Sequence, residues 1–196
     1  SHHLLKSAFD DAARDASEGL ALADSLGAHK QVAAFNRQLG QLKLKTGDFE
    51  NAKNHLELTL EWARTHSAGA LELQTIFSLA NLAFTQGDLT TAQRNFERYQ
   101  SLALNRGMVV MAANAGNVLG WLMKRLGRLE EAEQFYRDTL EAAERSKNLD
   151  LQSTVGSNLG TLLMQQGRLD DAADAYQLAL ERSLRLGRAG ITVMTQ

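Results

Sequence analysis

The 196-residue sequence contains no cysteine and no proline. Without cysteine the chain has no disulfide framework, no thiolate metal ligand and no cysteine nucleophile. Proline is costly inside helices and common in loops, so its absence favours long helices joined by short turns. Charge of one sign is also lacking, since 21 Lys and Arg face 23 Asp and Glu, for a net charge of −2. This near balance argues against a dedicated nucleic-acid-binding protein.

Long hydrophobic segments are missing as well. The segment Met108–Met123 carries no charge, but it is shorter than the roughly 20 apolar residues that a bilayer span needs. The first residues do not show the charged-then-apolar layout of a signal peptide. We therefore expect no membrane partner and a cytoplasmic location.

What the sequence does contain is a repeat with a period of 40 residues. A leucine followed by a small residue recurs at Leu39-Gly40, Leu79-Ala80, Leu119-Gly120 and Leu159-Gly160. Three more positions keep this register: a glycine (Gly47, Gly87, Gly127 and Gly167), an alanine (Ala52, Ala92, Ala132 and Ala172) and a large side chain (Leu56, Phe96, Tyr136 and Tyr176). We predict one repeat domain over residues 1–196, made of a half repeat at 1–27, full repeats at 28–67, 68–107, 108–147 and 148–187, and the start of a further helix at 188–196.

Each repeat has the pattern of two helices, here called helix A and helix B. Both halves of a repeat carry apolar residues at the 3.6-residue period, and no segment alternates with period 2. The glycine between the halves suits a left-handed residue that ends helix A, and Asp48 and Asp88 are expected N-caps of helix B. Mid-helix glycines such as Gly120 predict close helix crossings. The fold class is therefore an all-α solenoid of antiparallel helix pairs.

The residues at these positions resemble the tetratricopeptide repeat (TPR) family. Leu159-Gly160, Gly167, Ala172 and Tyr176 match the family pattern in one repeat, as Leu39-Gly40, Gly47-Asp48 and Ala52 do in another. The usual repeat has about 34 residues, so 40 is similar to the long-repeat class of Leu-Gly-Asn adaptors, kinesin light chains and Rap-type regulators. The resemblance implies a right-handed superhelix in which the A helices line a concave groove that binds a peptide or protein segment.

The helix A positions opposite the leucine stripe have an unusual composition. Of 20 such positions, eight are Asn or Gln, although the whole chain has only 23 of these residues; none is acidic and three are basic. Solvated helix faces usually carry mixed charges instead. Side-chain amides both donate and accept hydrogen bonds, so they can pair with the backbone of an extended peptide. The alternative is a plain solvated face.

We expect the ligand-binding residues to be Arg37, Gln38, Gln41, Phe77, Asn81, Asn114, Asn117, Trp121, Arg125 and Asn158. Phe77 and Trp121 would be apolar anchors, because Trp is typical of binding hot spots. The unopposed basic residues predict a neutral or acidic extended segment as partner. The Lys and Asn pattern of chaperone-tail binding is not met.

No pattern of catalysis or metal binding is found in the sequence. The five histidines show no ligand spacing, and the pairs Glu130-Glu131 and Asp170-Asp171 suit first-turn partners of the helix dipole. No phosphate-binding loop or nucleophile motif follows a strand. We expect no catalytic residue, no metal and no cofactor, and predict a non-catalytic scaffold or adaptor.

One alternative function and one alternative assembly remain open at this stage. The same groove would serve equally well in a peptide-sensing regulatory domain of a larger bacterial signalling or transcription regulator. Both ends of the sequence fall inside the repeat pattern, and solenoids need polar terminal repeats for solubility. We therefore expect either a piece of a longer protein or a homo-oligomer formed through the terminal repeats.

Overall fold

The computed structural model describes residues 2–187, and within this range nine α-helices account for nearly every residue and no strand occurs. The helices are α1 His2–Ser25, α2 His29–Thr46, α3 Phe49–Thr65, α4 Gly69–Thr85, α5 Leu89–Asn105, α6 Val109–Arg125, α7 Leu129–Arg145, α8 Leu149–Gln165 and α9 Leu169–Arg185. Helix α1 is the B helix of the half repeat, and the four full repeats are α2–α3, α4–α5, α6–α7 and α8–α9. The prediction of an all-α chain of helix pairs is confirmed.

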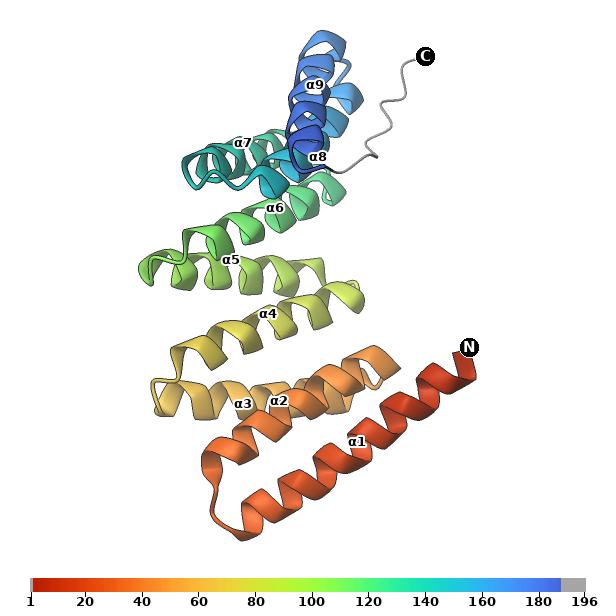
Figure 1. Cartoon of the computed structure of the whole chain (residues 1–196), viewed down its shortest axis with the longest axis vertical. Helices are drawn as coiled ribbons and strands as arrows, with labels where there is room; N and C mark the ends of the chain where they lie inside the picture. Colours follow the sequence, from red (N-terminus) through yellow and green to blue (C-terminus); the bar gives the residue numbers. More distant parts are fainter. Residues whose placement is uncertain (1, 188–196) are drawn as a thin grey trace. The chain divides into compact units, whose positions relative to one another are not determined.

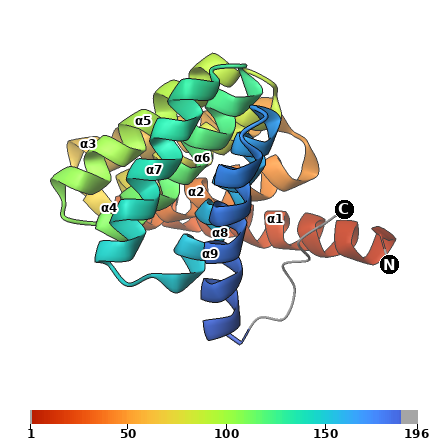
Figure 2. The same ribbon diagram turned by 90° about the horizontal axis from the view of Figure 1, so that it is seen from above.

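The chain forms two compact units, Ser1–Asn95 and Phe96–Gln196, which divide within α5. In the first unit, α1 packs on α2, α2 on α3 and α3 on α4. In the second, α6 packs on α7, α7 on α8 and α8 on α9, and the A helices α6 and α8 also touch each other. Figure 1 shows how each helix turns back after a short loop, and Figure 2 shows α8 and α9 side by side.

The turn from helix A to helix B has the predicted glycine geometry. Gly47 has φ 83° in the left-handed region, and Gly127 and Gly167 have φ 73° and 76°. This conformation is open to glycine at little cost and lets the backbone amides after the helix bond back to its last carbonyls. At Gly47 the acceptor is the carbonyl of Leu44.

The two predicted aspartate caps differ from each other. The Asp88 carboxylate accepts a 3.0 Å bond from the backbone N–H of Thr91, as an N-cap does, so that prediction is confirmed. Asp48 stands at the N-cap position of α3 as predicted, but its side chain makes no capping bond. Its carboxylate instead accepts from Asn51 Nδ2 at 2.9 Å and pairs with Lys43 Nζ at 3.0 Å. A nearby cation and amide compete successfully for its oxygens.

Small residues set the distance between helices A and B. Ala52, Ala92 and Ala132 are fully buried, and Ala172 is 3% exposed. A Cβ added to Gly120 would lie 2.6 Å from the ring of Tyr136, and one added to Gly160 would lie 2.9 Å from the ring of Tyr176. The predicted close crossings are therefore present, with the aromatic ring of helix B lying on the glycine of helix A.

The repeat boundaries at 1–27, 28–67, 68–107, 108–147 and 148–187 each enclose one B helix or one helix pair. The expected further helix at 188–196 lies outside the described residues. None of the helices in the described range is apolar over a length that would cross a lipid bilayer.

Candidate functional site

The stripe of helix A residues forms one face of α2 and α4 in the first unit, and of α6 and α8 in the second; we call it the A-helix face. Its 20 residues are exposed or half-buried except Ser78, which is buried. Leucines such as Leu39, Leu119 and Leu159 on the opposite side of these helices are buried. The 3.6-residue period therefore separated the two sides correctly.

In the first unit, hydrogen bonds connect the A-helix face of α2 to that of α4. Arg37 Nη1 donates to Gln41 Oε1 at 3.3 Å, and Gln41 Nε2 lies 3.5 Å from Ser78 Oγ. The Gln41 amide is thus occupied at both ends. Phe77, which lies on α4, is 39% exposed. The predicted residues Gln38 and Asn81 are exposed and half-buried, respectively.

In the second unit, a pair of asparagines connects the A-helix face of α8 to that of α6. Asn158 Nδ2 donates to Asn117 Oδ1 at 2.8 Å. The pair leaves the Nδ2 donor of Asn117 and the Oδ1 acceptor of Asn158 without a bond to any described residue. Both side chains are half-buried. A donor and an acceptor on adjacent helices match the C=O and N–H of a peptide group.

Beside this pair, the Arg125 guanidinium lies over the indole of Trp121, 5.1 Å from the ring centroid. Such cation–π contact is worth about 0.5–1 kcal/mol at an exposed site and holds both groups in place. Trp121 is half-buried and Arg125 is exposed. The fifth predicted residue of this unit, Asn114, is exposed near the start of α6.

The two arginines of the A-helix face differ in their partners from Arg128 and Arg168, which directly precede the B helices α7 and α9. Arg37 contacts an amide and Arg125 an indole, and neither contacts a carboxylate among the described residues. On the other side of the repeats, Arg128 pairs with Glu131, and Arg168 pairs with Glu133 at 2.8 Å. Uncompensated guanidinium groups on the A-helix face leave it electropositive.

A buried hydroxyl lies beneath the second unit's A-helix face. The Tyr176 hydroxyl is 2.9 Å from Thr161 Oγ1, whereas the Tyr136 hydroxyl has no hydrogen-bond partner in the described structure. Forty residues before Thr161 stands Trp121, which offers no acceptor. Burial raises the pKa of Tyr136 to about 12. The 40-residue register aligns Thr161 with Trp121, but the lack of a partner for the Tyr136 hydroxyl is seen only in the contacts of the described structure.

The structure thus brings together Arg37 with Gln41 in the first unit, and Asn117 with Asn158 and Trp121 with Arg125 in the second. Gln38, Phe77, Asn81 and Asn114 lie on the same face of their own unit. Within the described range, no cluster of His, Asp and Glu has the composition of a metal site.

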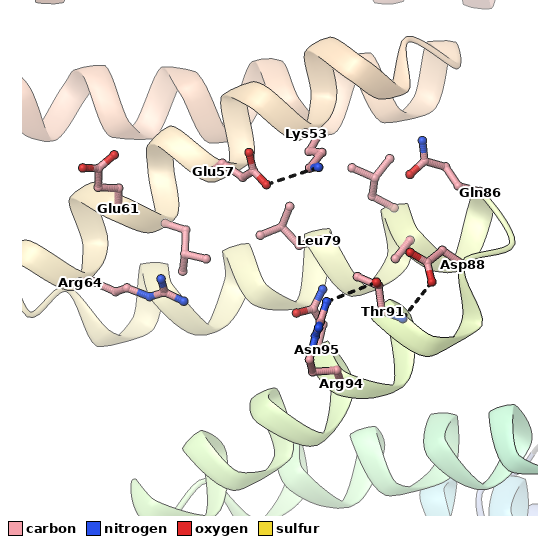
Figure 3. A pocket seen from close by; sticks show the side chains of 13 residues that line it. Lys53, Glu57, Glu61, Arg64, Leu79, Gln86, Asp88, Thr91, Arg94 and Asn95 are labelled. Carbon is pink, nitrogen blue, oxygen red and sulfur yellow. Dashed lines mark hydrogen bonds and ion pairs between the residues drawn. The ribbon is translucent and has the colours of Figure 1, made fainter.

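Sequence reasoning missed a hollow of about 500 Å³ in the first unit, between α3, α4 and the start of α5 (Figure 3). Lys53, Glu57 and Arg64 border it on α3, and Asp88 and Arg94 border it across the hollow. Lys53 pairs with Glu57 at 3.8 Å, and Arg94 donates to Thr91. The charges of the wall are balanced, so the hollow shows no preference for a cation or an anion.

Two family models, both described as tetratricopeptide repeat, match the sequence, one at residues 113–146 and 154–186 and the other at residues 38–66. The chain is a tetratricopeptide repeat protein. Repeats of this family are typically non-catalytic interaction scaffolds. A search of curated proteins finds no match.

Solved structures show the same repeat fold. BtubC (BKLC) from P. vanneervenii superposes with a TM-score of 0.77 at 24% identity, over 95% of this chain and 77% of that one. The TPR-like repeats of a putative kinesin light chain from Podosopora anserina give 0.75 at 13% identity, over 96% and 93%. A Rap protein complexed with Competence and Sporulation Factor gives 0.71 at 14% identity, over 95% and 52%. This TPR chain therefore spans about half the length of that Rap protein.

Proposed function

We propose that this TPR protein is an interaction scaffold whose A-helix face binds an extended protein or peptide segment. The observation that carries the proposal is the Asn117–Asn158 pair, which holds one amide donor and one amide acceptor ready on neighbouring helices. A peptide backbone offers the complementary groups whatever its sequence. Trp121, held by Arg125, supplies an aromatic surface at the same place.

The proposed ligand is neutral or acidic. Arg37 and Arg125 have no carboxylate partner among the described residues, so a carboxylate of the ligand would provide the missing charge. An acidic side chain would meet no like charge on this face, because none of its 20 positions is acidic. Lysine-rich segments would be repelled by the same residues.

A second candidate is a peptide-sensing regulatory domain of a larger protein. The Rap likeness favours it, because that neighbour is complexed with Competence and Sporulation Factor, and a second Rap neighbour is in complex with the Phr* peptide. Both candidates use the same face. They differ in whether binding changes the activity of an attached domain, which an assay of the parent protein with and without peptide would decide.

The test begins with selection of binders from a displayed library of random 12-residue peptides. The affinity of a selected peptide is then measured by calorimetry for the parent chain, Asn117→Ala and Trp121→Ala. Asn117→Ala removes a donor to the ligand and leaves Asn158 Nδ2 without its acceptor, and Trp121→Ala removes an aromatic anchor. We expect each loss to cost about 1.4 kcal/mol or more, which is at least a tenfold loss of affinity.

The matched control is Gln177→Ala, an exposed amide on the B helix α9. It should leave the affinity of the selected peptide unchanged. Retention of full affinity by both A-helix-face variants would place the peptide elsewhere and refute the proposal. Circular dichroism of each variant shows that the fold is intact, since both side chains are only half-buried.

A further inference from the structure

An open depression of about 450 Å³ lies in the second unit, where α7 ends, α8 begins and α9 ends. None of the predicted binding residues of the A-helix face lines it. Its walls consist of three cations, one acid, an amide and a leucine: Lys147, Arg182, Arg185, Glu144, Gln152 and Leu149.

A buried amide fixes one of the cations. Gln152 is only 6% exposed, and its Nε2 donates to the carbonyl of Ala143 at 3.0 Å. This bond turns Oε1 toward Arg182, whose Nε donates to it at 2.8 Å. The guanidinium is therefore held in one orientation, which preserves its other N–H donors for a ligand.

The equivalent position in the first unit carries an acid. Glu72 stands 80 residues before Gln152, and its carboxylate pairs with Arg64 Nε at 3.7 Å, although Arg64 is the counterpart of Glu144 and not of Arg182. At position 152 the isosteric amide supplies a hydrogen bond without a charge. Arg182 is therefore positioned but not neutralised by Gln152, and its one ionic contact with a described residue is with exposed Glu181 at 3.8 Å.

Lys147 stands at a position that disfavours lysine. Its φ is 53°, in the left-handed region; Gly27, Gly107 and Gly187 take the equivalent place in three other repeats, and Ser67, with φ 51°, takes it in the fourth. A residue with a Cβ in this conformation costs about 1–2 kcal/mol relative to glycine. Lys147 nevertheless lies at the rim of the depression, and its side chain has no ion pair with a described residue.

The opposing charges are few. Glu144 is the one carboxylate among the described residues of the wall, and Arg185, like Lys147, has no ion pair with any of the residues that the structure describes. Cations near the end of α7 and α9 also favour the helix dipoles. That effect explains neither the buried Gln152 that orients Arg182 nor a lysine in a left-handed turn.

We propose that this depression binds an oxoanion, and specifically a phosphate group. Three cations suit the double negative charge of phosphate better than the single charge of a carboxylate. The guanidinium of Arg182 would donate to phosphate oxygens, while Lys147 and Arg185 would act as charges at the rim. The site is independent of the peptide-binding proposal.

The test titrates inorganic phosphate into the ¹⁵N-labelled chain at constant ionic strength and follows the Gln152 side-chain amide and the Arg182 Nε–H by NMR. We expect saturable shifts with a Kd on the order of 1 mM, as for a small anion on one site. Acetate is the second arm, and we expect it to bind at least tenfold more weakly. Equal binding of acetate, or shifts that do not saturate, would overturn the phosphate site.

Three variants sharpen this test. Gln152→Glu keeps an acceptor for Arg182 Nε and neutralises Arg182, but it loses the Nε2 donor to the carbonyl of Ala143. It should weaken phosphate binding at least tenfold and lower the melting temperature. Lys147→Gly should weaken phosphate binding and raise the melting temperature, because the left-handed turn is relieved. Glu144→Gln should strengthen phosphate binding. Unchanged phosphate affinity in Gln152→Glu and Lys147→Gly would refute the site.

The doubly substituted Asn117→Ala/Trp121→Ala chain is the control that separates the two proposals. It should lose the selected peptide and bind phosphate normally. Loss of phosphate binding in this control would show that phosphate binds to the A-helix face, and would overturn the inference while leaving the peptide proposal intact.

Discussion

Tyr136 and Tyr176 occupy the same position of successive repeats, and their hydroxyl groups have opposite fates. Tyr176 donates to Thr161 Oγ1 at 2.9 Å, because the Thr161 hydrogen is used by the carbonyl of Ser157. The Tyr136 side chain is fully buried, and its hydroxyl has no partner within the described structure. Two equal substitutions should therefore have opposite effects on stability.

Tyr136→Phe removes a buried hydroxyl that lost its water bonds on folding, so we expect the free energy of unfolding to rise by about 1 kcal/mol. Tyr176→Phe removes a satisfied hydroxyl and leaves Thr161 without its donor, so we expect a fall of about 1 kcal/mol. Urea denaturation of both variants beside the parent chain measures the difference. Destabilisation of similar size in both would contradict the assignment of an unsatisfied Tyr136 hydroxyl.

Gly120→Ala should destabilise the protein although alanine favours helix. A Cβ at this position would lie 2.6–3.1 Å from three ring atoms of Tyr136, so the two helices would have to separate. Overpacking of this kind costs about 1–3 kcal/mol, against a gain of about 1 kcal/mol in helix propensity. Asn114→Ala, on the exposed side of the same helix, is the control and should be neutral or stabilising in thermal denaturation.

His55 should make the stability of the protein depend on pH. Burial and, secondarily, the Lys43 charge lower the pKa of His55 below its ordinary 6.5. Its Nδ1 lies 2.8 Å from Asn36 Oδ1, and Asn36 Nδ2 donates to the carbonyl of Val32, so the neutral ring donates from Nδ1. The folded state prefers this neutral ring. The resulting stability is present above pH 6.5 and is lost as the pH falls through the lowered folded-state pKa.

The measurement for His55 compares melting temperatures of the parent chain and His55→Gln between pH 7.5 and 5. Glutamine can keep a hydrogen bond to Asn36 and does not titrate in this range. We expect a smaller decrease on acidification in the variant than in the parent. Parallel curves would show that other groups cause the acid sensitivity.

Arg125 should determine the salt dependence of peptide binding. If an acidic peptide supplies the carboxylate that this side chain lacks, its affinity must fall as salt screens the pair. Arg125→Gln should bind more weakly at low salt and show a flatter dependence on sodium chloride between 50 and 500 mM. Arg145→Gln, which alters an arginine already paired with Glu141 at 2.8 Å, is the control. It should change neither the affinity for the peptide at low salt nor its dependence on sodium chloride.

The helix pattern could be predicted from the sequence because it depends on local chemistry. A 40-residue register, glycines at left-handed turns and alanines at helix crossings are visible in the order of residues, and the buried and exposed sides of the A helices followed from the 3.6-residue period. Asp48 stands at the predicted N-cap position but makes no side-chain capping bond, because Lys43 and Asn51 contact its oxygens instead, which the capping pattern does not reveal.

The candidate sites depend on which side chains meet across helices. Composition identified Asn117 and Asn158 as members of one stripe, but only the packing of α6 against α8 decided that their amides bond to each other and so expose one donor and one acceptor. The role of Gln152 was hidden for the same reason. A helical pattern reveals neither the burial of this amide nor its contact with Arg182, 30 residues away. By itself, the sequence determined the repeat, its helices and their faces, because periodicity is local. The tertiary structure decided which charges are paired and which remain open to a ligand, because that depends on distances between residues far apart in the chain.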